Sequence, residues 1–296
     1  MENLRGAAFM VFAMLCFAIE DALIKFLARD MPVGQVLVVM ALGGLLGFLG
    51  LAKLNGKPLW QAEYLNRKVL MRSACDATGT VLFATALTLI PLTTASAVIQ
   101  ATPLVVALGA ALFLGQPIGW RRWIAILFGF IGVLIIIRPG LEGFTPATLL
   151  AVAGMLALAS RDLLTRSLTV SLSGAQLATH TFSVVVPASM ALMALQGQRP
   201  VMPDTAGLLL LVAAVVVGMI AYLAIVTATR HGNAGIISSF RYSRMVFALV
   251  IGYIVFAERP DLLTLLGVAI IITSGIYTLV REARLHRASL TLKPAL

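Results

Sequence analysis

Apolar residues run along the chain in ten long blocks that short polar connections separate. Each block holds roughly 18 to 25 residues, which at the helical rise is enough to cross a hydrocarbon layer of about 30 Å. Lipid offers the backbone no hydrogen-bond partner, so a segment inside it must be a helix. The pattern predicts an all-α integral membrane protein, with transmembrane helices near residues 5–28, 33–52, 68–90, 93–115, 120–138, 146–167, 174–196, 205–229, 232–256 and 262–281.

The second half of the chain repeats the first. Asp162 lies 141 residues after Asp21, and at the same offset Arg166 corresponds to Lys25 and Gln176 to Gln35. Each half contains five predicted helices, and an odd number of crossings turns the second unit upside down relative to the first. We therefore predict two inverted five-helix repeats, residues 1–141 and 142–296, with a short basic tail at the end of the second.

Composition excludes an arrangement of soluble domains. Hydrophobic residues make up 60% of the chain, charged residues only 11%, and the mean hydropathy is +1.00. Too little polar surface remains to cover two water-soluble cores. The chain also has no phosphate loop, no metal-spaced histidines and no Gly-x-Ser-x-Gly motif, so we expect no enzyme activity, no ATP-driven pump, no cofactor and no metal.

The net charge of +10 follows the membrane topology and does not indicate a nucleic-acid site. With a cytoplasmic N-terminus, the basic residues on the cytoplasmic side are Arg5, Lys53, Lys57, Arg67, Lys68, Arg121, Arg122, Arg166, Arg230, Arg281, Arg284, Arg287 and Lys293. The outer side then carries only Arg29, Arg138, Arg199 and Arg259. The positive-inside rule thus predicts that both termini are cytoplasmic. The expected partners are the lipid bilayer and a small molecule, not nucleic acid, and both monomer and homodimer stay open.

Several ionisable residues fall inside the predicted helices. The basic ones are Lys25, Arg72, Arg161, Arg241 and Arg244. A charge at membrane depth costs a few kcal/mol, so such residues pair with one another or face a cavity. The i, i+4 spacing predicts three local ion pairs: Asp21 with Lys25, Asp162 with Arg166, and Arg72 with Asp76.

Glu20, Arg161, Arg241 and Arg244 have no such local partner, which makes them the stronger candidates for substrate contact or gating. Arg241 and Arg244 are three residues apart, and two guanidinium groups on one helix face are suited to clamp an anionic or carbonyl-rich molecule. In the alternative interpretation, Glu20 or Asp76 neutralises these arginines across the helix bundle.

Polar and aromatic residues in the same helices complete the candidate site. Gln100 adds a hydrogen-bonding group, and Tyr222, Phe240 and Tyr242 offer ring faces to a flat substrate. Pro103 is expected to bend its helix, since proline removes one backbone hydrogen bond. His180 is either a proton relay or a hydrogen-bonded structural residue.

Several stretches of the chain resemble the drug/metabolite transporters of the EamA type, which have ten helices in two repeats. They are residues 95–103 (ASAVIQATP), 112–116 (LFLGQ), 256–260 (FAERP) and 266–275 (LGVAIIITSG). The family usually has glutamate after leucine-glycine; here Glu258 keeps it and Gln116 replaces it. Arg244 also stands where the first repeat has the family proline, Pro103.

The resemblance implies a secondary transporter of the bacterial inner membrane, which moves a small polar organic metabolite by alternating access. It also implies a central cavity on whose lining helices Glu20, Arg72, Asp76, Gln100, Arg161, Tyr222, Arg241 and Arg244 lie. Residues 240–249 and 258–261 are similar to a branch that includes riboflavin transporters, so riboflavin uptake is the most specific expectation. Export of an amino acid, metabolite or drug is the alternative within the family, and an intramembrane enzyme or a sensor is the alternative of another class.

Overall fold

The computed structural model describes residues 2–56, 58, 60–115, 119–141, 144–169, 172–230, 237 and 239–291. Among these residues, all regular elements are helices. Lys57, Gln116 and Lys293, which entered the topology and motif predictions, lie outside the described residues. The helices are α1 (Glu2–Leu27), α2 (Val33–Leu54), η1 (Ala62–Leu65), α3 (Arg67–Leu89), α4 (Leu92–Ile99), α5 (Thr102–Leu114), α6 (Trp120–Ile137), α7 (Thr148–Arg166), α8 (Gly174–Leu195), α9 (Thr205–Arg230), η2 (Phe240–Tyr242), α11 (Ser243–Phe256) and α12 (Leu262–Thr291).

The ten predicted transmembrane segments are confirmed over the described part of the chain, with α4 and α5 forming one interrupted segment and η2 with α11 another. Within the residues described, six segments are long and apolar enough to cross a membrane by length and composition, and two shorter apolar stretches are Trp123–Ile137 and Leu262–Thr278. Helix α3 is less apolar because it carries Arg72 and Asp76 within its length.

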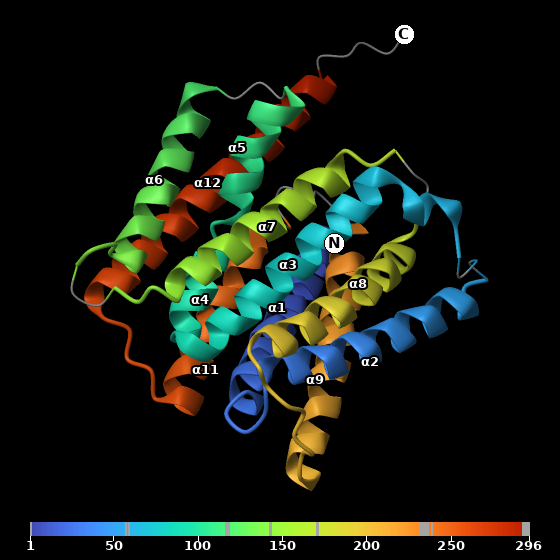
Figure 1. Cartoon of the computed structure of the whole chain (residues 1–296). Coiled ribbons are helices and arrows are strands. Elements are labelled where there is room, and N and C mark those ends of the chain that lie inside the picture. The colour runs from blue at the N-terminus through green and yellow to red at the C-terminus, as the bar shows by residue number, and fades with distance from the viewer. Residues whose placement is uncertain are drawn as a thin grey trace.

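The contacts between helices stay the same when each helix is replaced by its counterpart in the other repeat. Helix α3 of the first repeat packs on α7, and its counterpart α9 packs on α1, the counterpart of α7. Helices α2 and α8 contact each other as counterparts, and so do α6 and α12, which lie side by side at one edge of the bundle (Figure 1). Two units that exchange in this way are related by an approximate two-fold axis, and five segments in each unit make the repeats inverted.

The contact between α6 and α12 shows how the sequence permits such close packing. A Cβ atom built at Gly132 would lie 2.9 Å from the carbonyl oxygen of Gly267, and one built at Gly267 would lie 2.8 Å from that of Gly132. Any side chain at either position would therefore push the two backbones apart. Small residues of this kind allow helices to approach closely where lipid supplies no hydrophobic force between them.

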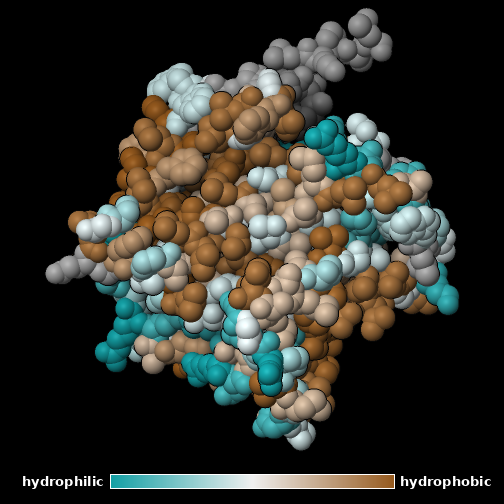
Figure 2. All heavy atoms as spheres, viewed as in Figure 1, coloured by the Kyte–Doolittle hydropathy of each residue, from teal (hydrophilic) through white to brown (hydrophobic). Residues whose placement is uncertain are grey.

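Apolar side chains also cover much of the outer surface. Figure 2 shows them most continuously over α5, α6 and α12, while hydrophilic residues gather toward the lower and right-hand margins of the same view. Leu127, Phe128 and Leu134 of α6 are each more than half exposed. A water-soluble protein rarely exposes apolar surface on this scale, and a lipid-facing surface requires it.

Candidate functional site

Two helices are interrupted at corresponding places in the two repeats. Helix α4 ends at Ile99 and α5 begins at Thr102, while the short 3-10 helix η2 ends at Tyr242, immediately before α11. The break at Gln100 and Ala101 lies just before Pro103, on the side where proline removes a helix hydrogen bond, so the bend predicted for Pro103 stays a prediction. Pro103 lies in the first turn of α5, where a missing N–H matters least. The Thr102 hydroxyl donates to the carbonyl of Ile99 over 2.5 Å in its place.

The two interruptions touch each other. Gln100 Nε2 donates a hydrogen bond of 3.1 Å to the backbone carbonyl of Arg241, which is 141 residues later in the chain. These two residues occupy equivalent positions in the repeats. The contact lies where backbone groups are released from regular helix pairing, which is a common setting for transporter binding sites.

Arg244, one turn beyond Arg241, forms an ion pair with Asp21 of α1. Its Nη2 and Nε atoms donate to Asp21 Oδ2 over 2.5 and 3.2 Å. The guanidinium also lies over the ring of Phe17, 5.3 Å from its centroid. Since Asp21 is only 4% exposed, a partner from the other repeat neutralises a buried charge. The predicted pairing of Asp21 with Lys25 was wrong.

A second cluster of charges joins α3 to α7. Arg161 binds Asp76 through Nη1 over 2.9 Å and its neighbour Asp162 through Nη2 over 2.8 Å. Arg72 reaches the other oxygen of Asp76 over 3.6 Å, which confirms that predicted pair. The prediction that Asp162 binds Arg166 was wrong, because Arg161 competes for this carboxylate and Arg166 is exposed.

Two hydroxyl groups also accept hydrogen bonds from Arg72. Its Nε donates to Thr165 over 3.0 Å and its Nη1 to Thr181 over 2.5 Å, which ties α3 to both α7 and α8. Beside Thr181 on α8, His180 Nδ1 shares a hydrogen bond of 2.7 Å with Ser73. The His180 ring also packs 5.2 Å from that of Tyr64. These contacts fit the structural interpretation of His180, and the proton-relay role stays a prediction.

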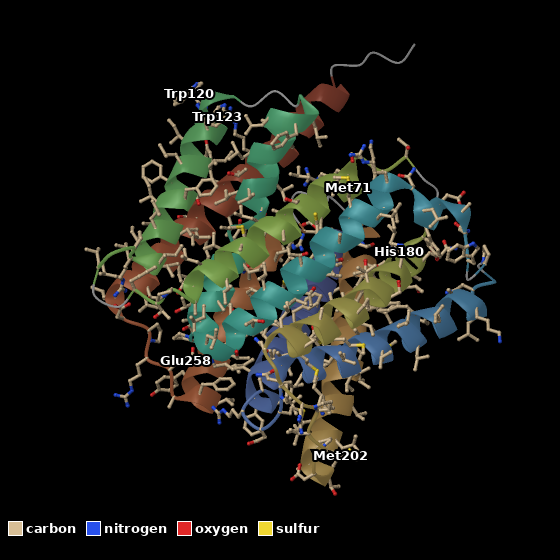
Figure 3. The ribbon with its side chains drawn as sticks, viewed as in Figure 1. Met71, Trp120, Trp123, His180, Met202 and Glu258 are labelled. Carbon is tan, nitrogen blue, oxygen red and sulfur yellow. The ribbon has the colours of Figure 1, made fainter. Side chains whose placement is uncertain are left out.

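Glu258 organises the end of the bundle opposite Trp120 and Trp123 (Figure 3). Its two oxygens accept the backbone N–H groups of Leu92 and Thr93 over 2.6 and 3.0 Å, so the carboxylate caps the first turn of α4. Lys25 lies 3.7 Å from Glu258 and donates to the carbonyls of Leu87 and Ile90 at the end of α3. Sequence reasoning found Glu258 only as a family motif residue, because a cap supplied by a distant segment leaves no local pattern.

Opposite charges pair across most of the bundle interior. Among the described residues these pairs are Lys25 with Glu258, Arg72 with Asp76, Arg161 with both Asp76 and Asp162, and Arg244 with Asp21. Within the described residues, the side chains of Glu20 and Arg241 make no hydrogen bond or ion pair. One carboxylate and one guanidinium of the bundle therefore have no ion-pair partner in the described part of the chain.

The aromatic candidates are used in different ways. Tyr222 donates its hydroxyl to the carbonyl of Gly174 over 2.7 Å and packs edge-on against Phe48, so its polar end connects α9 to α8. Tyr242 is buried with its hydroxyl against Gly275, and that hydroxyl has no hydrogen-bond partner within the described residues. Phe240 is 40% exposed. Tyr242 therefore packs on α12 and Tyr222 lies in a helix contact, while Phe240 adjoins Arg241 only along the chain.

A groove of about 590 Å³ lies elsewhere, between α6 and α12. Its walls are largely apolar and include Trp120, Phe128 and Tyr277. None of the charged residues of the ion-pair clusters lines it. The groove is therefore a feature of the bundle edge and not of the candidate site.

The chain is similar to several transporters of known name. It is 28% identical over 281 residues to a riboflavin transporter of Vibrio cholerae, covering 92% of this chain and 91% of that protein. A pseudopaline exporter of Pseudomonas aeruginosa is 27% identical, with 92% of this chain and 94% of the exporter covered. An S-adenosylmethionine uptake transporter of Rickettsia felis is 28% identical over 67% of this chain, a match that spans 66% of that transporter's own length.

A solved structure has the same fold, with a TM-score of 0.66 over 94% of this chain and 97% of the other at 18% sequence identity. The family model for EamA-like transporters matches this chain twice, over residues 4–138 and 145–280. Two matches of this length account for nearly all of the helices described above. The chain therefore belongs to the EamA-like transporter family.

Proposed function

We propose that this protein is a secondary transporter that moves a small polar organic metabolite by alternating access. The observation that carries the proposal is the contact between the two interrupted helices at Gln100 and Arg241, flanked by ion pairs that join the repeats. In inverted-repeat transporters, substrate binds where discontinuous helices of both repeats meet, and one repeat rocks against the other. Arg244 with Asp21 is a bond between the repeats that such motion would strain.

The setting of this activity is the bacterial inner membrane, with both termini in the cytoplasm. Support comes from the excess of Lys and Arg on the connections assigned to that side, among them Arg67, Lys68 and Arg121. The lipid bilayer is then the solvent of the outer helix faces, and a small molecule is the transported partner.

Two substrate classes have support. Riboflavin uptake is supported by the length of the match to riboflavin transporters, which in Rhizobium johnstonii reaches 95% of this chain at 26% identity. Transport of a metabolite with an amino-acid group, inward or outward, is supported by the similarity to S-adenosylmethionine and pseudopaline transporters. The second class is favoured by Glu20 and Arg241, which have no ion-pair partner in the described part of the chain.

Counterflow in proteoliposomes tests the proposal. Vesicles loaded with unlabelled riboflavin, S-adenosylmethionine or tryptophan are diluted into the labelled compound, and a carrier accumulates label by exchange. We expect exchange with one of these classes and none in protein-free vesicles. A protein that exchanges no member of the panel, and no other small polar metabolite, contradicts the assignment as a carrier.

A further inference from the structure

We infer that the substrate carries both a cationic and an anionic group, and that Glu20 binds the first and Arg241 the second. The inference rests on the proposed function and specifies the substrate class of the same site. It follows from the distribution of buried charge, in which one residue of each sign has no partner within the described residues.

An unpaired charge in a membrane-spanning helix is costly, so its presence calls for an explanation. Glu20 and Arg241 do not neutralise each other. Glu20 directly precedes Asp21, and Arg241 lies three residues before Arg244. Asp21 and Arg244 are joined by an ion pair. The two residues therefore flank the ion pair of Arg244 with Asp21, and a molecule with separated opposite charges is suited to bridge them.

Comparison of the repeats shows why Glu20 has no ion-pair partner among the residues that the structure describes. Its counterpart Arg161 projects from α7 onto Asp76 of α3. Helix α9, the counterpart of α3, presents Val217 and Gly218 instead of a charged residue at that level. A Cβ atom at Gly218 would lie 2.5 Å from Glu20 Oε1, so glycine leaves room for the carboxylate. In the other repeat, Asp76 neutralises Arg161. A cationic group of the substrate would neutralise Glu20 in the same way.

Arg241 is held in place through its backbone, and its guanidinium makes no hydrogen bond or ion pair with another described residue. Gln100 fixes the Arg241 carbonyl from the opposite repeat, and the 3-10 turn of η2 sets the residue apart from the regular helix α11. A guanidinium presents paired N–H donors that match the two oxygens of a carboxylate. Asp162 also attracts Arg241, but its ion pair is with Arg161. The other positive neighbour, Arg244, is paired with Asp21.

This charge pattern distinguishes between the two substrate classes proposed above. An amino-acid group carries an ammonium and a carboxylate a few bonds apart and satisfies both residues. Riboflavin carries no ionised group at neutral pH and leaves both charges unpaired. Desolvating two unpaired charges around a neutral ligand would weaken its binding, since buried charges need partners.

Thermal stabilisation of the purified, detergent-solubilised protein tests the inference, because a bound ligand raises the midpoint of unfolding. The probes are the twenty amino acids, S-adenosylmethionine, riboflavin and nucleosides. For an aromatic amino acid the set is tryptophan, tryptamine without the carboxylate, and indole-3-propionate without the amine. We expect stabilisation by at least one zwitterion and its loss with both single-charge analogues.

Variants then assign the charges. Glu20→Gln and Arg241→Gln should each raise the concentration of zwitterion needed for half-maximal stabilisation by about tenfold or more, as expected for a lost charge-assisted bond. Asp30→Asn and Arg166→Gln remove exposed charges of the same signs. These control variants should leave the half-maximal concentration of the zwitterion unchanged.

Three results would overturn the inference: no zwitterion stabilises the protein, an analogue with one charge stabilises it equally, or both site variants respond like the controls. Counterflow separates these results from failure of the proposed function. If the protein exchanges riboflavin and Glu20→Gln does not change that exchange, the protein is a transporter but its substrate is not a zwitterion. If a zwitterion binds and no compound is exchanged, the binding site is supported and the transport function is contradicted.

Discussion

Gln100 donates a hydrogen bond to the backbone carbonyl of Arg241, its own counterpart in the second repeat, over 3.1 Å. The bond joins the two interrupted helices where the approximate two-fold axis relates them. It places a neutral amide on one side of the contact and a guanidinium with no partner among the described residues on the other. The site is therefore asymmetric in charge although its backbone is symmetric.

Gln100→Leu should destabilise the protein by about 1 kcal/mol, because it removes this bond and leaves the Arg241 carbonyl without its side-chain donor. Thermal unfolding in detergent measures the change. Gln198→Leu, at an exposed position, is the control. Equal effects of the two substitutions would mean that the bond between the repeats contributes nothing to stability.

Adjacent carboxylates on α1 should respond in opposite ways to neutralisation. Asp21→Asn breaks a buried ion pair and is expected to cost roughly 3 to 5 kcal/mol. Glu20→Gln removes a carboxylate without an ion-pair partner among the described residues, so in the absence of ligand it should be neutral or stabilising. The unfolding midpoints of the two variants, measured together, check the contrast. A loss of stability in Glu20→Gln as large as in Asp21→Asn would show that Glu20 has a structural partner.

Glu258→Ala should loosen the start of α4, since the carboxylate accepts the backbone N–H groups of Leu92 and Thr93. A lost helix cap costs about 1 kcal/mol, and here Lys25 loses its partner as well. Hydrogen exchange at the amides of residues 92 and 93 should accelerate. Asp30→Ala serves as the control, and unchanged exchange in Glu258→Ala would rule out the capping role.

Outside the membrane, Asp261 should make stability depend on acidity. Hydrogen bonds from Arg138 and Thr264 lower the pKa of Asp261 to about 2. The unfolded chain has a carboxyl pKa of about 3.9, so the stabilisation is present above that pH and disappears as the pH falls toward 2. The difference in unfolding midpoint between wild type and Asp261→Asn should thus be constant from about pH 5 to 7 and shrink below pH 4. Because the carboxylate is half exposed, the difference should be small. A difference that persists unchanged to pH 2 would contradict this account.

The sequence alone was enough to predict the number of membrane-spanning blocks and the repeat, because bilayer thickness and helix geometry leave few alternatives. It failed for two of the three predicted charge pairs, and only Arg72 with Asp76 was confirmed. Asp21 and Asp162 each have a basic residue four positions later, yet neither binds it. Asp21 binds Arg244, and Asp162 binds Arg161. The choice depends on which side chains neighbouring helices and residues bring within reach, and the i, i+4 spacing contains no information about that.

The interruption before Pro103 was also only partly predictable. A proline in the sequence predicts a missing backbone hydrogen bond, but it does not predict whether the helix bends at that point or ends and begins again just before it. In this chain the Thr102 hydroxyl satisfies the Ile99 carbonyl and lets α5 begin one residue before the proline. The matching break at η2 has no proline, and its position became visible only from the structure.

Transport by variants of the two arginines near the contact between the repeats tests the central claim most directly. Arg241→Ala and Arg244→Ala are reconstituted at equal density beside wild type and the exposed-site control Arg166→Ala, and exchange of a transported substrate is measured. We predict that both site variants insert into the membrane normally and lose exchange, while the control retains it. Full exchange by both site variants would show that these arginines are structural and that substrate passes elsewhere.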